Sequence, residues 1–250
     1  MRRLASIMPL AAAFVLSVAG PTHAADPLAA ALADLDRHKA QGWAYTQKMN
    51  IAVMDEEAVT VVRRFDPAQP EGQRYEVLQI LDKDGKPLTD KKKIDDAKSE
   101  ADDMDLPSYS EVRRFVKGGT KLVREDADKA VYRVLPGKEG DDFSFGDITI
   151  AGSDMGEELE GTVTVRKAAQ PFVSQVRFHL KKPSGTTLLA KVRALDVTYA
   201  FAPQGPDGIV LPTGFAFDFD LTTLVFIDVK MKIDLANSDF AFVGVAEGEQ

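Results

Sequence analysis

The sequence predicts a β-rich α+β protein, in which a strongly curved antiparallel sheet or unclosed β-barrel of about ten strands is covered by an N-terminal helix and short central helices. Two observations support this fold class. Apolar and polar residues alternate over long segments, mostly in the second half of the chain, whereas helical spacing is confined to residues near 26–41 and 89–118. Long strands twist, so a sheet of this size must curl or close to cover its apolar face.

Composition narrows the functional classes. The 250 residues are 44% hydrophobic and 28% charged, which is typical of a folded globular protein rather than a disordered one. The net charge of −8 argues against nucleic acid as a partner, because nucleic-acid binding requires a surplus of Lys and Arg. The chain has no cysteine, which excludes disulfides, thiolate metal sites and a cysteine-linked lipid anchor.

The first residues have the composition of a secretory signal peptide. Arg2 and Arg3 precede the apolar run Leu10–Ala19, which ends shortly before Ala24. A helix that spans a bilayer needs about 20 apolar residues, so this run is too short to be an anchor. We therefore predict a signal peptide at 1–24 and a single β-rich domain at 25–250 with a helical insertion near 89–118. Cleavage near Ala24 would give a soluble periplasmic or secreted protein without an integral membrane span.

Three helical segments are predicted. Asp26 is a suitable N-cap, and the helix after it is expected to continue to about Gln41. Residues 89–104 are rich in Lys and Asp and predict a surface helix with a narrow apolar stripe. Ser108 and Glu111 have the spacing of a capping box and predict the start of a third, short helix.

The strands follow from residues that alternate with a period of two. In chain order we expect them near residues 45–53, 58–65, 74–81, 121–125, 130–135, 162–166, 172–180, 188–201, 215–221 and 225–235. Within 188–201 the apolar positions shift by one residue between Ala194 and Leu195, which indicates a β-bulge.

We find no constellation of catalytic residues. Beyond the predicted signal peptide the chain has only His38, near the end of the first predicted helix, and His179, on the polar face of a predicted strand. Neither position is typical of a catalytic base. The sequence has no nucleophile elbow, zinc-binding helix motif or phosphate loop. Basic doublets such as Arg63-Arg64 are expected to be solvated or paired across strands. We therefore expect no cofactor, no metal and no catalytic residue, and we favour a binding protein over an enzyme.

The order of the elements resembles the periplasmic lipoprotein-carrier (LolA-like) open β-barrel superfamily of Gram-negative envelopes. The segments that carry the resemblance are the strand at Trp43, residues 75–87 and residues 233–242. The resemblance rests on architecture and implies an acyl-binding hollow between the curved sheet and a helical lid. It also implies an arginine that fastens the lid, a role that the sequence does not assign to any particular Arg.

The chain has 14 Phe but one Trp and five Tyr, a composition that favours an apolar lining over a sugar-binding platform. We predict that the hollow is lined by Val176, Phe178, Val225, Ile227, Val229 and Met231. The expected function is binding of an apolar small molecule or lipid by an exported soluble protein. The alternative is a non-catalytic envelope-structural or protein-interaction module with a filled core and an envelope protein as its partner.

Overall fold

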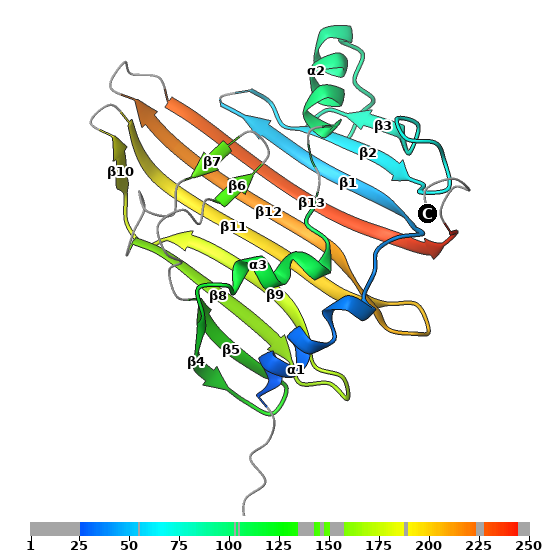
Figure 1. The fold of residues 1–250 in the computed structure, drawn as a ribbon. Helices are drawn as coiled ribbons and strands as arrows, with labels where there is room; N and C mark the ends of the chain where they lie inside the picture. The colour runs from blue at the N-terminus through cyan, green and yellow to red at the C-terminus, as the bar shows by residue number, and fades with distance from the viewer. Residues whose placement is uncertain are drawn as a thin grey trace, which may run out of the picture.

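The computed structural model describes residues 26–54, 56–102, 104, 106–134, 143–145, 148–150, 158–187, 190–223 and 228–244. The predicted signal peptide at 1–24 and the predicted lining residues Val225 and Ile227 lie outside these ranges. Within the described part the fold class is confirmed: one unclosed antiparallel sheet is accompanied by short helices (Figure 1).

The helical elements are α1 (Pro27–Ala33), the 3₁₀ turn η1 (Leu35–Arg37), α2 (Lys91–Asp102), the 3₁₀ turn η2 (Tyr109–Glu111) and α3 (Val112–Phe115). The strands are β1 (Trp43–Val53), β2 (Val59–Phe65), β3 (Tyr75–Leu81), β4 (Thr120–Glu125), β5 (Lys129–Val134), β6 (Phe143–Phe145), β7 (Ile148–Ile150), β8 (Leu159–Arg166), β9 (Phe172–Leu180), β10 (Ser184–Thr187), β11 (Ala190–Gln204), β12 (Ile209–Thr223) and β13 (Asp228–Phe242).

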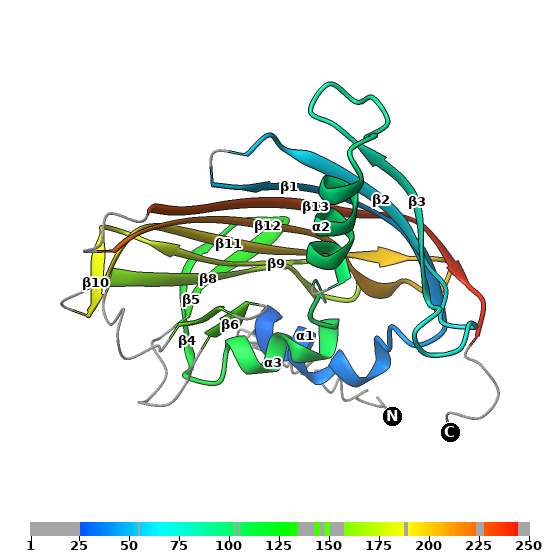
Figure 2. The ribbon, with the colours of Figure 1, turned by 90° about the horizontal axis from the view of Figure 1, so that it is seen from above.

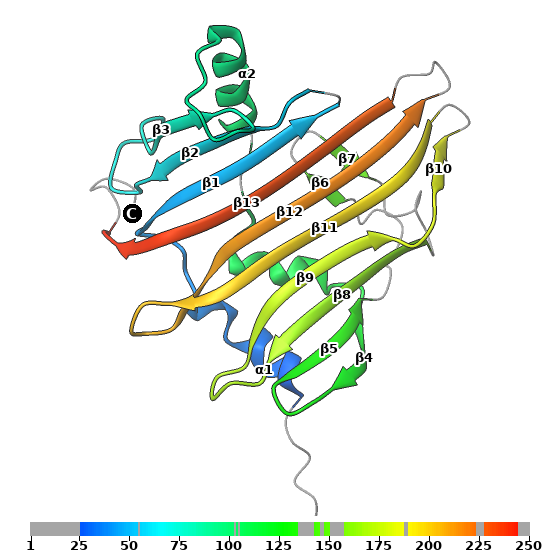
Figure 3. The same cartoon turned by 180° about the vertical axis from the view of Figure 1, so that it is seen from behind.

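The main sheet has the strand order β3-β2-β1-β13-β12-β11-β9-β8-β5-β4, with β10 paired to β11, while β6 and β7 form a separate hairpin. Both ends of the sheet bend toward the side that carries α1, α3 and the β6–β7 hairpin, so this side is concave (Figure 2). The opposite view shows the strands in front of α1 and α3 (Figure 3). The helices therefore cover the concave face.

Strand register determines which side chains reach the concave face, because directly opposed residues of antiparallel strands point to the same side. One continuous row crosses five strands from Tyr199 through Phe215, Leu235 and Met49 to Val61. All five side chains belong to or pack against one hydrophobic core. The convex face instead carries cross-strand ion pairs such as those between Arg177 and Asp196 and between Arg193 and Asp220. The alternation predicted from the sequence is thus confirmed.

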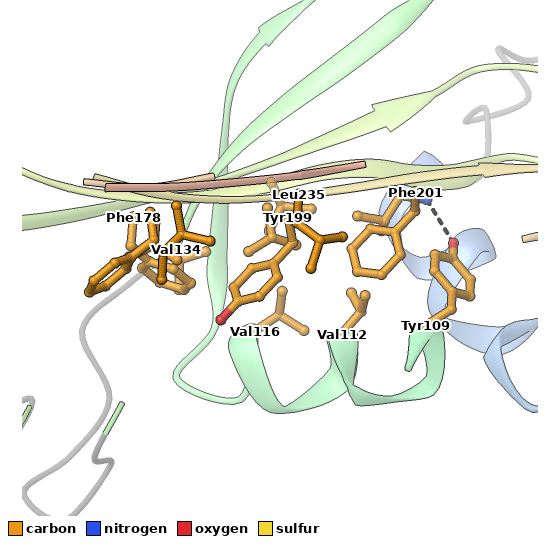
Figure 4. Close-up of a cluster of buried hydrophobic side chains, with 14 of the residues drawn as sticks. Tyr109, Val112, Val116, Val134, Phe178, Tyr199, Phe201 and Leu235 are labelled. Atoms are coloured by element: carbon orange, nitrogen blue, oxygen red, sulfur yellow. Dashed lines mark hydrogen bonds between the residues drawn. The ribbon is translucent and has the colours of Figure 1, made fainter. Parts of the chain in front are cut away.

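One half of the concave face is a filled core (Figure 4). The Phe115 ring of α3 lies 5.7 Å from the Phe178 ring and 5.2 Å from the Tyr199 ring. Across from Phe178, Gly161 leaves the space that the ring occupies, since a Cβ at Gly161 would lie 2.7 Å from it. This layer between β8, β9, β11 and the helices is closely packed.

The predicted capping box is confirmed, because the Ser108 amide donates to a Glu111 carboxylate oxygen at 2.7 Å. The predicted bulge in 188–201 is also confirmed, as the register between β11 and β12 shifts between Val192 and Ala194. The prediction of one helix to Gln41 is wrong: α1 ends at Ala33 and continues only as η1. A tertiary contact competes with the helix there, since the Val210 amide donates to His38 Nδ1 at 3.0 Å.

Candidate functional site

The other half of the concave face, formed by β13, β1, β2 and β3, is built in three rows that run across the strands. The innermost rows are apolar and buried, and include Met49, Val61, Ile233 and Leu235. The next row is polar, and the outermost row is aromatic.

The polar row consists of Asn237, Gln47 and Arg63, which are opposed in register on β13, β1 and β2. Arg63 Nε donates to Gln47 Oε1 at 2.7 Å, and Gln47 Nε2 donates to Asn237 Oδ1 at 3.2 Å. Asn237 Nδ2 in turn donates to the Pro212 carbonyl at 3.0 Å. These hydrogen bonds satisfy polar groups that would otherwise destabilise an apolar interior. The row is a connected hydrogen-bonded chain across three strands and reaches a fourth.

Arg63 connects this chain to the end of α2. Its side chain is 0% exposed, and its Nη2 donates to the Met104 carbonyl at 3.1 Å. Its Nη1 donates to Asp102 Oδ1 at 3.3 Å, and its guanidinium carbon lies 3.7 Å from the centre of the Tyr75 ring. Of the two alternatives expected for this doublet, solvation or pairing across strands, the second holds at Arg63. Its side chain is buried, and its cross-strand partner is Gln47.

The aromatic row contains Phe240, Tyr45, Phe65 and Tyr75, one from each of β13, β1, β2 and β3. The ring centres of Tyr45 and Phe65 are 4.9 Å apart in a stacked arrangement. Phe65 and Tyr75 are 5.0 Å apart and tilted, and Tyr45 and Phe240 are 5.8 Å apart and tilted. The row is thus a continuous series of ring contacts along one end of the sheet.

A β-bulge at the end of β13 brings Phe240 into this row. The register between β1 and β13 shifts by one residue between the pairs Ala44 with Ala241 and Thr46 with Ser238. Asp239, within the bulge, has a positive φ of 53°. Residues with odd numbers face the concave side before the bulge, but after it the even-numbered Phe240 lies against Tyr45.

A pocket of about 720 Å³ opens beside the aromatic row. Its walls come from β1, β2, β3 and β13, from the turn before β3, from the segment that follows α2 and from the start of β12. The lining residues are Ala40, Gln41, Gly42, Trp43, Tyr45, Phe65, Pro67, Glu71, Gly72, Arg74, Tyr75, Asp102, Leu106, Ser108, Leu211, Pro212 and Phe240. This volume is in the range of sites that hold one small ligand.

The charged groups around the pocket are few. Glu71 and Arg74 flank it, and Arg74 Nε donates to the Gln69 carbonyl at 3.4 Å. Asp102 faces the pocket but is hydrogen-bonded to Arg63. Neither histidine of the described residues lines the pocket, and those residues contain no group of three or more potential metal ligands. The pocket thus presents aromatic rings, three charged side chains and a few neutral polar groups.

His38 anchors the chain segment that enters the pocket wall at Ala40. Its imidazole is 4% exposed, with Nδ1 accepting from the Val210 amide and Nε2 lying 3.3 Å from Asp34 Oδ2. Its ring also packs edge-on against Tyr109, 5.2 Å between centres. Burial lowers the pKa of His38, and the nearby Arg37 adds to this, while the Asp34 carboxylate opposes it. The neutral form is therefore the one that fits.

The structure places the predicted lining residues elsewhere on the same face. Val176 and Phe178 are buried in the core of which Phe115 and Tyr199 are part. Val229 and Met231 are half-buried near the start of β13. None of these four lines the pocket. Tyr45, Phe65 and Tyr75 were missed as a group, although their strands were predicted, because only the register brings them together.

Comparison with protein-family models, with curated proteins and with solved structures gives no match to this chain. Among the described residues, no helix is both long enough and apolar enough to cross a membrane.

The first prediction concerns Arg63. Arg63→Met should lower the free energy of unfolding by ~1–3 kcal/mol, because it leaves the buried Gln47 amide oxygen without its donor. It should also speed amide hydrogen exchange in α2, because the end of this helix loses its hydrogen bonds to Arg63. Asp102→Asn is the control: its side chain is 68% exposed, so the effect should be under ~1 kcal/mol. Unchanged stability and exchange in Arg63→Met would contradict the assigned role.

The second prediction concerns pH. The pKa of His38 is lowered in the folded protein, so its imidazole is protonated at a higher pH in the unfolded chain than in the folded one. The contribution of His38 to stability is therefore complete above its ordinary pKa of 6.5 and is lost as the pH falls through the folded pKa. The slope from this group is at most about 1.4 kcal/mol per pH unit.

His38→Gln keeps an oxygen that can accept from the Val210 amide at any pH. Urea denaturation between pH 5 and pH 8 should show a flatter dependence in His38→Gln than in the wild type. Parallel curves for the two proteins would contradict the assignment.

Proposed function

We propose that this protein is an exported carrier or binding protein that holds an apolar ligand, a lipid or acyl chain, between its curved sheet and the helices beside it. The observation that carries the proposal is the aromatic pocket, which opens at the end of an otherwise buried apolar face. A concave cavity that presents aromatic rings together with a few polar groups is typical of a small-ligand site.

The rows behind the pocket support a bound ligand rather than an unfinished core. The inner apolar rows are already buried by other parts of the protein. The Asn237–Gln47–Arg63 row lies between these apolar rows and the pocket. The aromatic rings are therefore not needed to close the core. Their ring edges and the neighbouring Leu106 can contact an alkyl chain.

We further propose that Arg63 has the lid-fastening role that the resemblance to LolA-like carriers implies. It is buried on the sheet and bonds to Asp102 and to the Met104 carbonyl, at the end of the charged helix α2. Of the twelve residues of α2, only Ala97 and Ala101 are buried, so this helix has little packing of its own. A helix held mainly at one end is suited to move when a ligand enters.

The second candidate is a non-catalytic structural or protein-interaction module. Its support is the other half of the concave face, where Val112, Phe178 and Tyr199 are buried in one core (Figure 4). A module of this kind would bind no lipid. Ligand binding at the aromatic pocket therefore separates the two functions.

The third prediction tests this binding. Native mass spectrometry of protein purified without detergent should show bound lipid. An acyl probe should change the fluorescence of Trp43, the only tryptophan and a pocket residue. Tyr75→Ala should weaken probe binding at least about fivefold, because it removes one ring of the row.

Leu78→Ala is the matched control, since Leu78 lies on the same strand, is 47% exposed and does not line the pocket. It should bind the probe like the wild type. A bare mass together with no fluorescence response in the wild type would favour the structural module.

The fourth prediction concerns export. We propose cleavage near Ala24 and a soluble periplasmic or secreted mature form, because a basic start and a short apolar run precede this position. N-terminal sequencing of protein from the envelope or culture fraction should give a start next to Ala24. A start at Met1 or Arg2 would contradict export by this route.

A further inference from the structure

We propose that the pocket selects an uncharged lipid with a single chain, of which a monoacylglycerol is a representative. This inference rests on the proposed function and adds the ligand class. Three features of the pocket carry it: its volume, the orientation of its rings and the balance of its charges.

The volume limits the number of chains. At about 720 Å³ the cavity lies within the roughly 300–1,000 Å³ that is typical of a site for one drug-sized ligand. The apolar face beyond it is closed by the polar row and by buried side chains such as Met49 and Val61. A cavity of this size fits one acyl chain, so a second or third chain would have to lie outside it.

The ring contacts disfavour a cationic head group. Quaternary ammonium groups bind over the faces of aromatic rings, where the electron density is negative. Here Tyr45 and Phe65 stack on each other, Phe65 and Tyr75 are in contact, and the Arg63 guanidinium already lies over the Tyr75 ring. Each of these three rings therefore has at least one face in contact with another group of the protein. A cation that met a ring edge instead would meet weakly positive hydrogens.

The charges also disfavour an anionic head group. Glu71 and Arg74 line the same pocket with opposite charge, and Asp102 is compensated by Arg63. A carboxylate or phosphate that approached Arg74 would also approach Glu71. Ser108 and Gln41 add neutral polar groups that can hydrogen-bond to a hydroxyl or an ester. An uncharged head group is repelled by neither Glu71 nor Arg74.

The fifth prediction compares head groups on one chain length. Trp43 fluorescence is titrated with a monoacylglycerol, the matching fatty acid at pH 8, the matching alkyltrimethylammonium and the diacylglycerol, all below their aggregation concentrations. The monoacylglycerol should bind at least about tenfold more tightly than each of the other three.

Two variants test the charge argument with opposite outcomes. Glu71→Gln should lower the ratio of monoacylglycerol affinity to fatty-acid affinity by about fivefold. Arg74→Gln should lower the ratio of monoacylglycerol affinity to alkyltrimethylammonium affinity by about the same factor. Each variant serves as the control for the other, because the charge that each leaves uncompensated should widen the preference that the other one narrows.

Equal or tighter binding of the fatty acid or the ammonium compound would overturn the selectivity while leaving lipid binding in place. Equal binding of the diacylglycerol would overturn the limit of one chain. If none of the four compounds binds, the proposed function itself fails.

Discussion

An unclosed sheet has to cover its apolar concave face, and this requirement organises the rest of the molecule. The exposed apolar surface would otherwise be unfavourable in water. Between β8 and β11, the helices α1 and α3 supply the cover, and the layer is filled by side chains such as Val112 and Phe178. At β1–β3 the helix α2 buries only two alanines. The pocket occurs where the helical cover is thinnest.

The buried Arg63 compensates for a helix that is poorly stabilised by itself. Three lysines open α2 and acids lie toward its end, an order that opposes the helix dipole. The pKa of Glu100 is raised by burial and by the nearby Glu56 and Asp96, which shows further repulsion around the helix. Burying a guanidinium is costly unless its donors are satisfied. Its bonds to Gln47 and the Met104 carbonyl meet that condition and fix the end of α2 against the sheet.

Local patterns were sufficient for the elements and insufficient for the site. Alternation located the strands, and the one-residue shift before Leu195 located the bulge in β11. The same alternation places Arg63 between Val61 and Phe65 on the apolar face of β2. The interpretation of Arg63 and Arg64 together as a basic doublet overlooked this position. The predicted end of the first helix was wrong, because a tertiary hydrogen bond from the Val210 amide to His38 overrides the helical periodicity there. The pocket depends on the pairing of β13 with β1. Their paired residues Gln47 and Asn237 are 190 positions apart in the sequence, so no local pattern predicts the pairing.

The bulge at Asp239 makes the pocket wall depend on strand register rather than on composition. If β13 paired with β1 without the bulge, every residue of the sequence would remain but the regular alternation of β13 would continue to its end. Phe240 and Phe242 would then turn to the convex side. A deletion of one residue at the bulge would instead leave Phe240 on the concave side, so related chains should be compared by strand register and not by residue identity alone.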